Sequence, residues 1–313
     1  MMSEKYIVVV GGLNLDIAGL SGPIYREFDS NIGDITTNAG GVGHNIAQNL
    51  TSLEVPTYLV TVYGDDHFGD ILVNECQKAN ISLEYAEQLA GKKSSTYLYV
   101  TDNNGDMVTA INDMKIVDEI TPDFLADKLD FINGATLCVI DGNISKASID
   151  WLAAHVTVPI FVDPVSVAKA DRFLDALDKI DTIKPNEYEA ELFTGIKVVD
   201  EETAKQAAQA MLDKGIENVY ISLGAKGMLA ATGDKAVLVE PMVDKIVSTN
   251  GAGDCTMATL AWARFQYGGV LDVEEACQFA QAAASITIES NQAVSPDLNV
   301  RDVVRRAVEN YGG

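Results

Sequence analysis

Basic residues are scarce in this 313-residue chain, which holds 22 Lys and Arg against 46 Asp and Glu and has a formal net charge of −24. Binding to nucleic acid or to an anionic membrane needs clustered cations, so this charge argues against both partners and favours a small molecule. If that molecule carries phosphates, backbone amides, helix N-termini and a divalent metal must supply much of the positive potential.

Several common catalytic motifs are also missing. Only three histidines occur, none in an HExxH motif, and the sequence contains no G-x-x-x-x-G-K-[ST] and no G-x-S-x-G run. These absences argue against the zincin, P-loop and nucleophile-elbow classes of enzyme. The four cysteines lack CxxC spacing, which argues against a zinc site or a disulfide framework and fits a reducing compartment.

The start of the chain has no long hydrophobic run. Residues 7–10 are apolar, but this run is too short for a signal peptide or a membrane span. We therefore expect a cytoplasmic protein with no membrane partner. Hydrophobic residues nevertheless make up 47% of the chain, which is enough for an ordinary globular core.

Apolar, β-branched runs alternate with stretches of helical character along the chain. The predicted strands are residues 6–10, 57–62, 137–140, 160–162, 182–183 and 219–222. The predicted helices are residues 42–53, 66–79, 145–155, 201–214, 253–267, 273–289 and 298–310. Buried strands separated by helices indicate a mostly parallel sheet covered on both faces, so the predicted fold class is a doubly wound α/β architecture.

Two segments, about residues 13–37 and 94–112, do not follow this alternation of strands and helices. They alternate polar and apolar residues, and the second contains the turn sequence Asp-Asn-Asn-Gly-Asp at 102–106. Such a pattern predicts hairpins that pair into a small lid sheet. Because no linker or repeat interrupts the sequence, we predict one domain over residues 1–313, with the lid as an excursion from it.

The strongest local signal is the run Asn-Gly-Ala-Gly-Asp at residues 250–254, which precedes a helix-forming sequence. Small residues let backbone N–H groups approach a ligand, and a helix N-terminus adds partial positive charge, so Gly251, Ala252 and Gly253 suit an anion hole. Asp254 would then lie beside a transferring phosphoryl group and could act as a general base. The alternative is an aspartate favoured at a helix start by the helix dipole, after a glycine turn.

A second glycine cluster, Gly-Gly-Val-Gly-His-Asn at residues 40–45, leads into another predicted helix. Paired glycines let amides reach substrate hydroxyls, and Asn45 could donate to and accept from a sugar diol. A tight turn before a helix is the alternative interpretation.

Five motifs occur in order over nearly the whole chain: Gly-Leu-Asn-Leu-Asp at 12–16, the cluster at 40–45, Lys-Pro-Asn-Glu-Tyr-Glu at 184–189, Ser-Leu-Gly-Ala-Lys-Gly at 222–227 and the run at 250–254. Together they resemble the PfkB family of ribokinase-like carbohydrate and nucleoside kinases. This resemblance implies transfer of the γ-phosphate of ATP, with Mg²⁺, to a hydroxyl of a small sugar-bearing substrate. It also implies a ribokinase-like sheet with a small β-sheet lid.

The resemblance implies a role for individual residues. Those expected to hold the sugar are Asn14, Asp16, Gly41 and Asn45, and those expected to border the nucleotide are Asn186, Ser222, Gly224 and Gly227. Asp254 would be the base, and the amides of Gly251, Ala252 and Gly253 would face the γ-phosphate. Glu189 would act near Mg²⁺ through water in the metal's shell, and a solvated helix carboxylate is its alternative interpretation. The family usually has an aspartate where this chain has Ser248, so activation by a monovalent cation stays open.

Within the family, the run Ala-Ile-Asn-Asp-Met at residues 110–114 is most similar to members that phosphorylate the 5′-hydroxyl of pseudouridine. Asn112 and Asp113 are then expected to contact the base from the lid, although Asn and Asp at a hairpin end are also explained by turn chemistry. The alternatives are ribose, fructose or adenosine as substrate, or a catalytically silent sugar-binding regulator. Exposed lid strands could pair into a homodimer or be covered by substrate.

Overall fold

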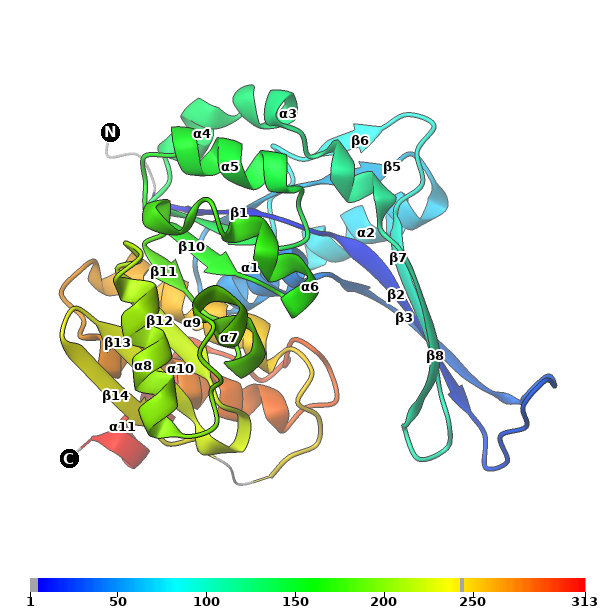
Figure 1. Cartoon of the computed structure of the whole chain (residues 1–313). Coiled ribbons are helices and arrows are strands. Elements are labelled where there is room, and N and C mark those ends of the chain that lie inside the picture. The colour runs from blue at the N-terminus through cyan, green and yellow to red at the C-terminus, as the bar shows by residue number, and fades with distance from the viewer. Residues whose placement is uncertain (1–4, 243–244, 313) are drawn as a thin grey trace.

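The computed structural model describes residues 5–242 and 245–312. Its centre is an eight-stranded sheet in the order β14-β13-β12-β11-β10-β9-β1-β4 (Figure 1). Six strands pair in parallel, namely β1 (Ile7–Val10), β4 (Thr57–Val60), β9 (Leu137–Asp141), β10 (Ile160–Asp163), β11 (Thr182–Ile183) and β12 (Asn218–Ser222). The predicted mostly parallel sheet is confirmed. An antiparallel hairpin of β13 (Met228–Thr232) and β14 (Lys235–Val239), which the sequence did not predict, extends one edge.

The sheet divides the hydrophobic core in two because successive side chains of a strand point to opposite faces. In β1, Ile7 and Val9 belong to one cluster and Val8 and Val10 to the other. The helices that contribute to the first cluster are α1 (Val42–Ser52), α2 (His67–Lys78), α9 (Ala252–Tyr267), α10 (Val273–Ile288) and α11 (Val300–Tyr311). Those contributing to the second are α3 (Pro122–Ala126), α4 (Leu129–Asn133), α5 (Lys146–His155), α6 (Val167–Ala170), α7 (Glu187–Thr194) and α8 (Glu201–Leu212). Both faces of the sheet are therefore covered, as a doubly wound fold requires.

The predicted strand at residues 57–62 is divided in the structure. β4 ends at Val60, and β5 (Val62–Gly64) leaves the main sheet to pair in parallel with β6 (Glu87–Leu89). The division falls at Thr61, whose carbonyl accepts a hydrogen bond from the Glu87 amide. The short helices α3, α4 and α6 were not predicted, because four or five residues are too few to show helical periodicity. Four 3₁₀ segments complete the described elements: η1 (Lys115–Glu119), η2 (Asp171–Phe173), η3 (Leu177–Lys179) and η4 (Gly224–Lys226).

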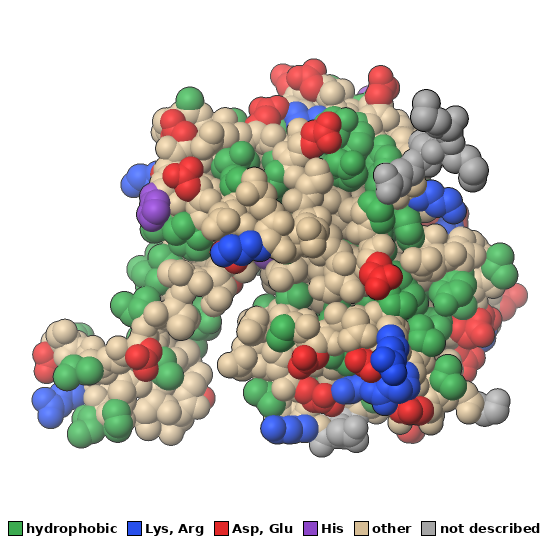
Figure 2. All heavy atoms as spheres, turned by 180° about the vertical axis from the view of Figure 1, so that it is seen from behind, with side chains coloured by type: hydrophobic (Ala, Val, Ile, Leu, Met, Phe, Trp, Pro, Cys, Tyr) green, Lys and Arg blue, Asp and Glu red, His purple; other side chains and the backbone are tan. Residues whose placement is uncertain are grey.

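A second sheet of four strands, which we call the lid, projects from the body of the molecule (Figures 1 and 2). Its strands are β2 (Asn14–Ser21), β3 (Gly33–Gly40), β7 (Ser95–Thr101) and β8 (Met107–Asp113), in the order β3-β2-β7-β8. The two segments with hairpin character therefore pair with each other, since β2 and β7 are parallel neighbours. The remaining two pairs of the lid are antiparallel.

The carboxyl ends of the parallel strands meet at one edge of the main sheet, and polar residues gather there. Asp141 ends β9, Asp163 ends β10 and Ser222 ends β12, while Lys184 directly follows β11. Ligands of open α/β sheets bind at this edge, so the fold itself indicates where to look for a site. Within the described part of the chain, no helix is both long and apolar enough to cross a membrane.

Candidate active site

A cavity of about 770 Å³ opens at this edge of the sheet. It lies between the loops after the strands and the N-terminal end of α9, and eight of the residues predicted for the site line it: Asn186, Glu189, Ser222, Gly224, Gly227, Ala252, Gly253 and Asp254. Residues from motifs more than sixty positions apart thus meet in one place. We take this cavity as the candidate active site.

The run at 250–254 forms the start of α9 in the way that the glycines predict. Gly251 has a φ of 77°, and a Cβ there would lie within 1.8 Å of the Ala293 carbonyl oxygen, so no other residue fits. No side chain among the described residues caps this end of the helix. The first-turn amides of a 16-residue helix therefore face the cavity without a protein side chain to satisfy them.

Asp254 lies in the first turn of α9 and connects the cavity to the glycine cluster at residues 40–45. Asn45 Nδ2 donates a hydrogen bond of 2.8 Å to Asp254 Oδ2. Burial, reinforced by the negative charge of Asp163, raises the pKa of Asp254 to about 7, although Asn45 and Lys184 act in the opposite direction. A carboxylate with a pKa near neutrality suits a general base, because it can both accept a proton and exist ionised near pH 7.

Lys184 is a buried cation that begins the motif at 184–189 but was not among the predicted site residues. Its Nζ is 3.1 Å from Asp163 Oδ2, and both side chains are less than 10% exposed. Burial lowers the pKa of Lys184, but the charges of Asp163, Glu189 and Asp254 outweigh this effect and hold the pKa above its usual value. A Cβ on Gly253 would lie 3.5 Å from Lys184 Nζ, so the ammonium group stands beside the start of α9. This chain, although acidic overall, therefore places a positive charge beside the predicted anion hole.

The residues predicted to hold a sugar also come together. Asn14 Nδ2 donates a hydrogen bond of 2.5 Å to Asp16 Oδ1, and a Cβ on Gly41 would lie 2.8 Å from Asn14 Oδ1. Gly41 has a φ of 98°, which a side chain rarely adopts. Burial raises the pKa of Asp16 to about 6, against the hydrogen bond from Asn14. Together with Asn45, these residues form a polar group that adjoins Asp254.

Asp141, which was not among the predicted site residues, fixes the two glycine loops that carry this group. Its Oδ2 accepts hydrogen bonds from the Gly12 and Gly43 amides, at 2.8 and 2.7 Å, and the side chain is fully buried. Asp141, Asp163 and Lys184 each end or follow a predicted strand. A charged residue at the carboxyl end of a buried strand is the signal that could have found all three.

Asn186 and Glu189 form a capping box at the start of α7. Asn186 Oδ1 accepts from the amides of Tyr188 and Glu189, and Glu189 Oε2 accepts from the Asn186 amide at 2.9 Å. Glu189 is 3% exposed and burial raises its pKa, so the solvated-carboxylate interpretation is wrong. No group of three or more metal-ligating side chains occurs among the described residues. A Mg²⁺ ion here would depend on one or two carboxylates, phosphate oxygens and water, which is how Mg²⁺ is usually held in proteins that bind nucleotides.

The lid residues predicted to contact a base lie apart from the cavity. Asn112 pairs with Tyr97, which pairs with Asp16, so these three side chains share one face of the lid. Asp113 is the next residue of β8 and points to the opposite face, and its Oδ1 is 3.5 Å from Lys115 Nζ. The structure therefore brings Asn112, but not Asp113, to the face that carries Asp16.

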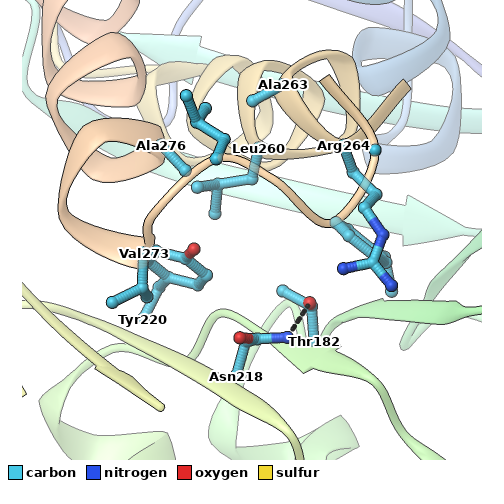
Figure 3. Close-up of a pocket in the computed structure, with 11 residues that line it drawn as sticks. Thr182, Asn218, Tyr220, Leu260, Ala263, Arg264, Val273 and Ala276 are labelled. Atoms are coloured by element: carbon cyan, nitrogen blue, oxygen red, sulfur yellow. Dashed lines mark hydrogen bonds between the residues drawn. The ribbon is translucent and has the colours of Figure 1, made fainter. Parts of the chain in front are cut away.

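A smaller pocket of about 50 Å³ lies at the opposite edge of the sheet (Figure 3). Thr182 and Asn218, the first residues of β11 and β12, line it with Tyr220 and Arg264. None of the predicted site residues is among those lining it. Eight predicted site residues line the larger cavity and none lines this pocket, so the larger cavity is the candidate site.

The mostly parallel sheet, covered by helices on both faces, and the lid are those of the ribokinase-like class of kinases. The model of the pfkB family carbohydrate kinases matches residues 4–299, and the chain belongs to this family. It is therefore a phosphotransferase with an alcohol acceptor, of a family of ATP-using kinases.

Named relatives agree with this assignment. The chain is 34% identical to the pseudouridine kinase of Escherichia coli, over 99% of this chain and 98% of that one. It is 30% identical to an uncharacterized sugar kinase of the same organism, over 96% and 82%. The structure of Arabidopsis thaliana ribokinase complexed with ribose and ATP is similar with a TM-score of 0.84 and 26% identity, over 97% and 98% of the two chains.

Proposed function

We propose that this kinase phosphorylates the 5′-hydroxyl of pseudouridine, using ATP and Mg²⁺. The observation that carries the catalytic part is the position of Asp254, at the start of α9 and hydrogen-bonded at 2.8 Å to Asn45 of the sugar group. The substrate is supported by the 34% identity to a pseudouridine kinase over nearly the full length of both chains.

In the proposed reaction, Asp254 accepts the proton of the attacking 5′-hydroxyl as its oxygen forms a bond to the γ-phosphorus. The bond from that phosphorus to the β-phosphate oxygen breaks, and ADP leaves. The amides of Gly251, Ala252 and Gly253 donate to the γ-phosphate oxygens as charge builds on them. Lys184 is proposed to add positive charge to the phosphate site, because it stands beside the helix start and is the one basic side chain among the described residues that line the cavity. The ionised form of Asp254 is favoured by the same ammonium group.

The nucleotide is proposed to occupy the cavity bordered by Asn186, Ser222, Gly224 and Gly227. Glu189 is the carboxylate best placed to bind water molecules around Mg²⁺, because it is buried and lines the cavity. Bound Mg²⁺ would neutralise charge on the phosphates. The polar group formed by Asn14, Asp16, Gly41 and Asn45 is proposed to hold the ribose hydroxyls.

Asn112, but not Asp113, is proposed to contact the base. Pseudouridine has an N1–H donor where uridine has the bond to its sugar, so a selective site needs an acceptor. Asn112 shares the lid face of Asp16, whereas the opposite orientation of Asp113 argues against a role at the base.

The proposal is tested by initial rates with pseudouridine, uridine, ribose, fructose and adenosine, with Asp254→Asn as the control for contaminating kinases. Pseudouridine should have the highest kcat/KM. A preference for ribose would favour a ribokinase. Binding of a sugar without turnover of any acceptor would favour a silent regulator.

A homodimer through the lid is proposed as well. The lid face opposite Asp16 carries Ile17, Leu98 and Ile111 in one row, with Ile35 in the next row, and Ile35 and Ile111 are 77% and 64% exposed. A second copy of the lid would cover this apolar face. Light scattering should give twice the chain mass, and Ile111→Asp should give monomers. A monomeric wild type would refute the dimer.

A further inference from the structure

Two tyrosines of β7 lie on the lid face that carries the sugar-binding acid. Tyr97 pairs with Asp16 on one side and with Asn112 on the other. Tyr99 pairs with Ala18 and Ala110, in the next row of the same face. Because paired residues of neighbouring strands project to the same side of a sheet, the two rings stand side by side on this face. Their centroids are 5.6 Å apart, with planes inclined by 34°.

The surroundings leave this aromatic surface open. Ala18 and Ala110 are the neighbours of Tyr99 and are too small to cover its ring. Neither tyrosine hydroxyl has a hydrogen-bond partner within the described residues, and both side chains are only partly buried. Burial is the main cause that raises the pKa of Tyr99, and the negative charge of Asp16 adds to it, which is consistent with a ring close to that carboxylate.

The opposite face of the same strand has a different composition. Leu98 projects there with Ile17 and Ile111, so β7 places aliphatic side chains on the face opposite Asp16 and aromatic ones on the Asp16 face. A general preference for aromatic residues in strands does not explain this segregation. The row of Tyr99 is two residues, about 7 Å, beyond the row of Asp16. A ligand group that reaches Tyr99 must therefore extend past the sugar ring that Asp16 would hold.

We infer that Tyr97 and Tyr99 form a platform on which the heterocyclic base of a ribonucleoside stacks, which makes them determinants of specificity for nucleosides over free pentoses. Every nucleobase has a π-face, so stacking recognises the base as a class. Asn112, in the same row as Tyr97, would then act on the edge of the stacked ring. This inference rests on the proposed function and deepens it.

The test uses Tyr97→Leu and Tyr99→Leu, with Tyr97→Phe and Tyr99→Phe as matched controls that keep the ring. The acceptors are pseudouridine and 1,4-anhydro-D-ribitol, which has the same sugar ring with hydrogen in place of the base. The latter is measured as a substrate, or as a competitive inhibitor where its turnover is undetectable. The KM for ATP and the melting temperature of each variant report on the nucleotide site and on folding.

Each leucine variant should lower kcat/KM for pseudouridine by about 5- to 150-fold, the range that loss of one base–aromatic stack produces. Most of the loss should fall in KM. The phenylalanine variants should stay within about threefold of wild type, and all four should leave anhydroribitol and ATP unaffected. An equal loss for anhydroribitol would identify the tyrosines as structural parts of the lid and overturn the inference. So would leucine variants with unchanged pseudouridine kinetics.

The results that would refute the proposed substrate differ from those that would refute the platform. If the wild type prefers uridine or adenosine to pseudouridine, pseudouridine is refuted as the substrate. If the leucine variants then lose the preference for that nucleoside over anhydroribitol, the platform is supported. A wild type that prefers pseudouridine, with leucine variants like wild type, would refute the platform and support the substrate.

Discussion

Replacement of Asp254 by asparagine should abolish activity and stabilise the protein, and the two effects have one cause. The pKa of Asp254 is raised from 3.8 to about 7 by burial and by Asp163. Between those values the folded state binds more protons at this residue than the unfolded state, so stability declines as pH rises through the window. Above pH 7 the ionised carboxylate costs up to about 4 kcal/mol relative to its protonated form.

Asparagine keeps the size and polarity of the side chain but cannot ionise. Asp254→Asn should therefore unfold at a higher temperature than wild type at pH 8, by a few degrees, and the difference should shrink towards pH 4. Loss of the general base should lower kcat by about 10²- to 10⁴-fold above pH 7, and by less at lower pH, where the wild-type carboxylate is itself protonated.

The assay combines thermal melts at pH 5 and pH 8 with ADP release in the presence of pseudouridine. The exposed carboxylate Asp234 provides the control, since Asp234→Asn should change neither quantity. Activity within a few-fold of wild type would remove Asp254 from the reaction. If the variant is less stable than wild type at pH 8, ionisation of the Asp254 carboxylate does not destabilise the folded state.

Three further predictions concern other parts of the site. Lys184→Met should lower kcat by about 10²- to 10³-fold, because it removes the cation beside the anion hole, and a kcat near wild type would contradict this role. It should also lower the free energy of unfolding, measured in urea, by about 3–5 kcal/mol, because it leaves Asp163 unpaired. Asn112→Ala should reduce the ratio of kcat/KM for pseudouridine over uridine more than it changes the KM for ATP, and an unchanged ratio would exclude Asn112 from base recognition. Because Ser248 is neutral, K⁺ should stimulate the enzyme only weakly relative to a bulky organic cation, and a large K⁺ dependence of the initial rate would refute this.

Much of the fold was predictable because buried parallel strands are marked by local apolar runs. The exceptions have local causes. β13 has the sequence Met-Leu-Ala-Ala-Thr, in which the final Thr is the single β-branched residue, and was missed. The strand at 57–62 was predicted as continuous because its sequence is uniformly apolar around Thr61. Only the pairing of β5 with β6 shows the change of sheet.

Parts of the site were predictable where a glycine indicates a backbone conformation with positive φ, as at Gly41 and Gly251. It was not predictable where the partner is distant in sequence and no motif marks the pair. The ion pair of Lys184 with Asp163 joins β10 to the segment after β11, and only the folded sheet brings the two together. Asn112 and Asp113 were treated alike because they are adjacent, yet strand alternation sends them to opposite faces.

The prediction of a single domain over residues 1–313 and the expected cytoplasmic location remain predictions. Limited proteolysis bears on the first: cleavage confined to the lid loops, with the rest of the chain protected, is expected of one domain. Separate stable fragments from the body would contradict it.

The most direct test of the proposed function is a competition experiment. Pseudouridine, uridine, ribose, fructose and adenosine are mixed at equal concentration with limiting ATP and Mg²⁺, and the phosphorylated products are identified by ³¹P and ¹H NMR. We predict that pseudouridine 5′-phosphate is the main product and that Asp254→Asn forms none. Ribose 5-phosphate or another nucleotide as the main product, or phosphate on a different hydroxyl of pseudouridine, would contradict the proposal.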